Sequence, residues 1–137
     1  MNLSKNFTLQ ELTKSFIAQK MGIKNEAGES EINNLRKLCE DILQPIRNKW
    51  GRAITITSGF RCKELNKAVG GSVHSQHIEG EAADITSDNN RELWSMIISM
   101  IKNKEIIVGQ LIDEKRLKWI HISLPSKSVI NMMLAIK

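Results

Sequence analysis

Two histidines and an aspartate are the residues of this chain whose types and spacing could bind a metal ion. His77 and Asp84 are seven residues apart around a glycine, and His121 follows much later in the segment KWIHIS. Zinc readily binds imidazole nitrogen and carboxylate oxygen, and a catalytic zinc site has three protein ligands with a fourth position left to water. We therefore expect His77, Asp84 and His121 to form a zinc site. The alternatives are a His–Asp hydrogen bond that holds a loop and, for His121, a partly buried strand histidine.

The segments around these residues predict that the three side chains converge. Gly70-Gly71 excludes a helix before His77, and the turn signal Glu79-Gly80 favours a hairpin with Asp84 on the returning strand. In EAADIT and KWIHISL, apolar residues alternate with the candidate ligands. This alternation places Asp84 and His121 on the polar faces of strands whose opposite faces are apolar.

A longer pattern around the ligands gives a resemblance to a known family. The pattern SxHxxGxAxD is met in full by Ser75, His77, Gly80, Ala82 and Asp84. This pattern resembles that of the zinc D-Ala-D-Ala carboxypeptidases and the phage L-alanyl-D-glutamate endopeptidases. The small phage-type branch of this family is the most similar, because the chain also has its further segments: SGFR, the run Asn66 to Gly71, QLIDE, WIHIS and the opening NFTLQELTKS. The resemblance covers nearly the whole chain. It implies zinc as cofactor, peptidoglycan stem peptides as substrate, and His77, Asp84 and His121 as the metal ligands; His74 falls outside the pattern and is expected in a loop at the mouth of the cleft.

A hydrolytic zinc enzyme also needs a general base. By its resemblance to the family's QLI-x-E pattern, Glu114 is the candidate, and in a regular strand it would share a face with Gln110 and Ile112. Asp113 is the adjacent competitor and would point to the other face. Other branches place the base two or three residues before the last histidine, where this chain has residues that cannot act as bases. The alternative for both acids is a charged hairpin tip, DEKRLK.

Arg61 and two neighbouring polar residues are the candidates for substrate binding. Arg61 follows Ser58-Gly59-Phe60, where members of the family carry an arginine that steadies the substrate or the oxyanion. A guanidinium stays charged and can bind a carboxylate in a planar fork. Ser75 and Gln76 could donate hydrogen bonds to a peptide. The alternatives are a surface arginine and two residues that only cap the turn before His77.

Length and composition limit what else the chain can contain. Its 137 residues, 41% of them hydrophobic, fit one domain with a single core, so we expect residues 1–137 to form a single zinc peptidase domain. The two cysteines lack the spacing of a zinc knuckle or a disulfide framework, and we expect both to be free thiols, with Cys39 in the core. A net charge of +5 suits an anionic cell wall. Scattered basic residues and only 4% aromatic residues argue against nucleic acid as a partner.

The opening residues have no apolar run long enough for a signal peptide, and no segment approaches a transmembrane span. We therefore expect synthesis in the cytoplasm and, as for an endolysin, release to the cell wall by phage or lysis machinery, with the protein acting as a monomer. The expected function is zinc-dependent hydrolysis of peptidoglycan stem peptides, as a carboxypeptidase or an endopeptidase. The alternative is a non-catalytic, zinc-containing cell-wall-binding or virion-associated module.

The pattern of elements predicts an α+β fold in which N-terminal helices pack on an antiparallel sheet that carries the zinc site. A capping box at Thr8 to Glu11 opens a helix to about Lys20, and an apolar stripe from Ile32 to Ile46 marks a second helix that Pro45 should kink or end. Two further helices are expected at 63–69 and around 93–101. Strands are expected at 53–57, 82–86, 106–112, 118–124 and 130–136.

Overall fold

The computed structural model describes residues 1–127 and 129–136, which form an α+β fold of two small sheets and several helices. The helices are α1 (Leu9–Thr13), α2 (Phe16–Met21), α3 (Glu29–Leu38), the π-helical turn η1 (Cys39–Leu43), α4 (Gln44–Trp50), α5 (Lys63–Ala68) and α6 (Asn90–Lys102). The strands are β1 (Asn2–Ser4), β2 (Phe7–Thr8), β3 (Thr55–Ser58), β4 (Ala82–Thr86), β5 (Gln110–Glu114), β6 (Trp119–Ser123) and β7 (Met132–Ile136). The predicted fold class is confirmed.

The larger sheet has five strands in the order β3-β4-β6-β5-β7. All its pairs are antiparallel except β5 with β7, which is parallel. The chain reverses after β6, but both edges of β6 are already paired with β4 and β5. The last strand joins at the free edge of β5, where its direction makes the pair parallel. This one pair departs from the antiparallel sheet that the sequence predicts.

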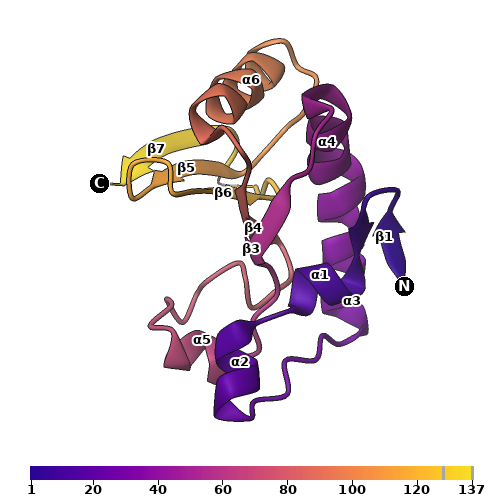
Figure 1. Ribbon diagram of the computed structural model, residues 1–137, viewed down its shortest axis with the longest axis vertical. Helices are drawn as coiled ribbons and strands as arrows, with labels where there is room; N and C mark the ends of the chain where they lie inside the picture. The colour runs from indigo at the N-terminus through magenta and orange to yellow at the C-terminus, as the bar shows by residue number, and fades with distance from the viewer. Residues whose placement is uncertain (128, 137) are drawn as a thin grey trace.

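The helices lie beside the sheet and supply about half of the buried core residues. Figure 1 shows α3 and α4 forming a column on one side of the sheet, with α6 at one end of the molecule and α2 and α5 together at the other. One buried cluster joins the apolar faces of the strands to these helices; its members include Leu35, Ile42, Ile46, Ala83, Ile85, Leu93, Ile97, Ile120 and Ile122. Among the described residues, no helix is long and apolar enough to cross a membrane.

The first predicted helix is divided in two. The capping box is present, because the Thr8 hydroxyl accepts from the Glu11 amide and the Glu11 carboxylate accepts from the Thr8 amide. At Lys14, however, the backbone becomes extended, and the Ser15 hydroxyl caps α2 by accepting from the Ala18 amide. A single helix to about Lys20 is therefore wrong, since Ser15 supplies a new start within it.

The second predicted helix continues past its proline. The chain remains helical from α3 through η1 to the end of α4 at Trp50, so Pro45 does not end it. The amide of Gln44 donates to the carbonyl of Cys39, which is the wider π-helical pattern directly before the proline. Proline has no N–H to donate to the preceding turn, and a π-helical turn at that point accommodates the missing hydrogen bond.

Candidate metal centre

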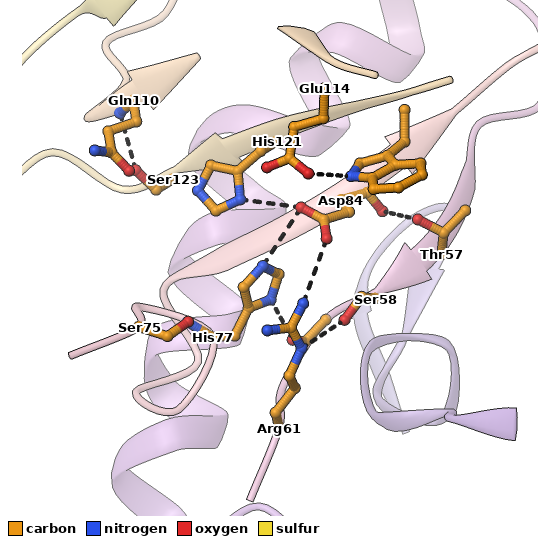
Figure 2. A network of polar contacts seen from close by, with 12 residues as sticks. Thr57, Ser58, Arg61, Ser75, His77, Asp84, Gln110, Glu114, His121 and Ser123 are labelled. Atoms are coloured by element: carbon orange, nitrogen blue, oxygen red, sulfur yellow. Dashed lines mark hydrogen bonds and ion pairs between the residues drawn. The ribbon is translucent and has the colours of Figure 1, made fainter. Parts of the chain in front are cut away.

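The three residues predicted as metal ligands lie together on the side of the sheet opposite the core. Asp84 on β4 and His121 on β6 are direct partners in the strand register, and His77 reaches them from the segment 76–80. One ligand atom from each residue lies within 4.8 Å of the other two, and all three residues are buried. The Asp84 Oδ1 atom is 3.0 Å from His121 Nδ1 and 3.4 Å from His77 Nε2 (Figure 2).

A backbone carbonyl orients the first histidine. His77 Nδ1 is 2.7 Å from the carbonyl oxygen of Gly59, and an oxygen there can only accept, so Nδ1 carries the proton and donates. His77 Nε2 is then free to act as a ligand on the Asp84 side. Ligand histidines in proteins commonly donate their second ring nitrogen in this way, which fixes the tautomer and the ring orientation. Two imidazole nitrogens and a carboxylate oxygen thus fit the ligand set of a catalytic zinc ion.

The carboxylate of Asp84 is ionised despite its burial. Burial alone would raise its pKa, but in their protonated form His121 and His77 donate hydrogen bonds to it and carry positive charges, which outweigh burial and hold the pKa well below its usual range. A carboxylate must be deprotonated to bind a metal ion. Asp84 therefore needs no change of protonation near neutral pH before it can act as a ligand.

The segment that carries His77 is a series of turns and not a strand. Strand β4 pairs with β3 and β6, so the hairpin expected around Glu79-Gly80 does not form. The turn holds its shape through Gly80, whose φ is +74° and whose Cα packs against the backbone of Glu31 in α3. The Ser75 hydroxyl accepts from the His77 amide at 3.1 Å, and the His77 carbonyl accepts from the Arg61 amide at 3.0 Å. These contacts place the histidine without strand pairing.

Arg61 lies beside the three ligands in a polar cradle. Its Nε donates to the Ser58 hydroxyl at 3.1 Å, its Nη1 donates to Asn66 Oδ1 at 3.2 Å, and its Nη2 is 3.6 Å from Asp84 Oδ2 (Figure 2). A guanidinium has five N–H donors, so these contacts leave donors for another group. The side chain is 17% exposed, and it lines the pocket above the ligands. A carboxylate or oxyanion in that pocket could bind the remaining N–H groups.

Sequence reasoning did not single out the side chain that holds Arg61. Asn66 is buried in α5, where its Oδ1 accepts from Arg61 and its Nδ2 donates to the Ser72 carbonyl at 2.8 Å. Gly71 passes so close to the Asn66 amide that a side chain at this position would collide with it. The run from Asn66 to Gly71 appeared in the sequence only as part of the family pattern. An asparagine followed five residues later by a glycine was the available signal, but it does not by itself indicate a partner.

Glu114 faces the pocket and Asp113 does not. Glu114 and its register partner Trp119 both line the pocket, and Trp119 Nε1 donates to Glu114 Oε2 at 2.6 Å. Asp113 instead accepts from the Leu117 amide at 2.6 Å, which holds the tight turn between β5 and β6. The predicted alternation of the two acids along the strand is therefore present. No sequence pattern indicates the Trp119–Glu114 hydrogen bond.

The pocket is a hollow of about 820 Å³ with the three candidate ligands in its wall. Ser75, Gln76 and Gln110 also line it, as does His74, which lies outside the ligand cluster. The Ser75 hydroxyl is occupied by the His77 amide, and the Gln76 side chain donates to the Leu124 carbonyl at 3.4 Å. The arrangement combines a candidate metal-binding triad, a carboxylate and a cation around one space. These are the components of a metal-assisted hydrolytic site.

In a comparison with known protein families, the family model of Peptidase M15 matches residues 5–123. The matched range includes all three candidate metal ligands together with Arg61 and Glu114. A comparison with curated proteins gives no match.

Proposed function

The chain belongs to the Peptidase M15 family of metallopeptidases, and we propose that it is a zinc-dependent enzyme that hydrolyses peptidoglycan stem peptides. The bond cut would be of the D-Ala-D-Ala carboxypeptidase or the L-Ala-D-Glu endopeptidase type. The observation that carries this proposal is the convergence of His77, Asp84 and His121 in the wall of a pocket that also holds a carboxylate and an arginine. The net charge of +5 is consistent with an anionic cell-wall substrate.

In this proposal the side chains of His77, Asp84 and His121 would hold the zinc ion. When bound, zinc supplies Lewis acidity that polarises a carbonyl group and lowers the pKa of water. The protein contributes the fixed orientation of the ligands, through the Gly59 carbonyl for His77 and the strand register for Asp84 and His121. No repacking of the core is needed, since all three side chains already point toward one another (Figure 2).

Glu114 would act as the general base. Its Oε2 is occupied by the Trp119 N–H, which fixes the carboxylate against the pocket and leaves Oε1 to accept a proton from the attacking water. The same oxygen would later pass this proton to the leaving amine. Asp113 cannot share the role, because its carboxylate holds the turn on the other face of β5.

Arg61 would stabilise the negative charge that develops on the substrate. Its guanidinium is held from three sides by Ser58, Asn66 and Asp84, so its orientation is fixed before the substrate arrives. Donors that are already oriented toward the developing charge contribute more to catalysis than mobile ones. Ser75 and Gln76 would complete the substrate contacts along the same wall of the pocket.

The test is to incubate the zinc-loaded protein with purified sacculi and, separately, with a free stem pentapeptide, and to identify the products by mass spectrometry. The expected result is cleavage of at least one substrate, abolished by chelation of the metal and restored by added zinc. Release of D-alanine alone would assign a carboxypeptidase, and an internal cut would assign an endopeptidase. Retention on sacculi without cleavage of either substrate would refute the enzyme and favour a cell-wall-binding module.

A further inference from the structure

A second hollow, of about 400 Å³, adjoins the candidate catalytic pocket. The two spaces share Arg61, Val69, Asp84 and Trp119 as wall residues, so the Arg61–Asp84 pair stands between them. The second hollow extends from this pair to the N-terminal end of α2, at Phe16. None of the roles assigned above to the catalytic residues uses this space.

The walls of the second hollow carry apolar side chains that the fold leaves in water. Phe16 is 76% exposed, Ile17 is 42% exposed, and Val69 at the end of α5 is 37% exposed. Single exposed apolar residues are common on protein surfaces. Three of them on two separate helices around one hollow, next to a candidate reaction site, form the apolar wall that a ligand could cover.

The charges in this hollow are also distinctive. Lys14 and Arg61 line it, and among the residues that the structure describes Asp84 is the only acidic one in its wall. The Asp84 carboxylate is already engaged by both histidines and by Arg61. The hollow therefore presents cations beside an apolar surface. A peptide residue with a carboxylate next to an alkyl group complements such a surface in both respects.

We propose that this hollow is a second substrate subsite, which binds the part of a peptide that continues beyond the residues in the catalytic pocket. The inference rests on the proposed peptidase function and deepens it. A site that removes only a terminal residue needs a wall that ends the binding cleft one residue past the cut. Here space is available on both sides of the Arg61–Asp84 pair, so the substrate extends on both sides of the cut and makes apolar contact with Phe16 and Ile17.

The kinetic test compares two synthetic stem-type peptides, a short one that spans only the scissile bond and a long one extended by two residues on each side. With zinc-loaded protein, kcat/KM should be higher for the long peptide, and Phe16→Ala should lower this long-to-short ratio by about tenfold, equivalent to ~1.4 kcal/mol. Met21→Ala is the matched control, because Met21 is a 58% exposed apolar residue of the same helix that does not line the hollow. This control should leave the ratio unchanged.

A binding measurement separates this inference from the proposed function. Titration of zinc-loaded Glu114→Gln protein with the long peptide should shift the NMR amide signals of residues 14–17, and the short peptide should not. If the wild-type protein cuts peptides but Phe16→Ala keeps the ratio and these signals do not move, the subsite is refuted while the peptidase stands. If the wild-type protein cuts neither peptide, the proposed function fails, and the titration alone decides whether residues 14–17 bind a peptide.

Discussion

Replacing Glu114 with glutamine removes the proton acceptor proposed for the reaction while keeping the size of the side chain. Glu114 is not a member of the candidate ligand cluster, and the glutamine carbonyl oxygen can still accept from Trp119 Nε1, as the carboxylate does at 2.6 Å. We therefore expect Glu114→Gln to fold and to retain zinc. What it loses is the ability to take a proton from water.

The expected loss of activity follows from the usual contribution of a positioned general base. Such a group contributes roughly 10²- to 10⁴-fold to the rate, which corresponds to about 3–5 kcal/mol of activation free energy. Trp119→Phe should cost less, because it removes one hydrogen bond to a carboxylate that can still accept a proton. At about 1.5 kcal/mol for such a hydrogen bond, the expected loss in kcat is roughly tenfold.

Asp113→Asn is the matched control for Glu114→Gln, since the two acids are adjacent and face opposite sides of β5. Asparagine can still accept from the Leu117 amide, so the turn should persist with a loss of stability of about 0.5–1 kcal/mol and normal kcat. Steady-state kinetics on one peptide, with the zinc content of each variant measured by elemental analysis, gives the comparison. Near-normal turnover of zinc-loaded Glu114→Gln, or a larger loss in Asp113→Asn, would refute the assignment of the base.

Three further outcomes are expected from other parts of the structure. Elemental analysis should find about one zinc ion per chain in the wild-type protein. His77→Ala should lose this zinc and His74→Ala should retain it; full zinc in His77→Ala would exclude His77 as a ligand. Asn66→Ala should lower kcat by about tenfold, because Asn66 holds the guanidinium of Arg61. A double-mutant cycle with Arg61→Ala should then show strongly non-additive losses of activity, and additive losses would mean that Asn66 does not act through the arginine. Burial, followed by the charges of two nearby glutamates, raises the pKa of the Cys39 thiol from 9.0 to about 12. The buried thiol is thus favoured in its neutral form. Its contribution to the free energy of unfolding should be complete below pH 9 and fall by about 1.4 kcal/mol per pH unit between pH 9 and 12. Urea unfolding of the wild-type and Cys39→Ala proteins would detect this effect, because the free energy of unfolding should fall more steeply with pH in the wild type.

The parts of the fold that the sequence predicts best are the strands with strict alternation. The strand at 82–86 is found with the predicted bounds, and Asp84 and His121 face away from Ala83 and Ile120 in the core. A two-residue period fixes which side chains share a face, and a buried apolar face then fixes the register between strands. The sequence pattern therefore orients both candidate ligands, Asp84 on β4 and His121 on β6.

Other features depend on contacts that a sequence pattern does not encode. His77 reaches the site from turns that are held by the backbones of Gly59 and Glu31, so a hairpin signal at Glu79-Gly80 predicts the wrong local structure around it. The parallel pairing of β7 with β5 depends on the strand order of the whole sheet, which no local pattern specifies. The cradle around Arg61 likewise joins residues from β3, α5 and β4 whose pairing no local period specifies.

The buried polar side chains of this fold lie mostly at the candidate metal centre and its pocket, and not in the apolar core that stabilises the fold. Among the described residues, the buried polar side chains are Gln44, Asn66, His77, Asp84, His121 and Ser123. Apart from Gln44, which binds the turn after β1, each belongs to the candidate metal centre or hydrogen-bonds a residue that lines its pocket. Burying a polar group costs free energy unless it is fully hydrogen-bonded, so a core selected for stability alone would use apolar residues at these positions. Because the opposite face of β4 and β6 packs into the apolar core, substitutions at the metal centre should remove metal binding and activity while the cooperative unfolding of the protein is retained.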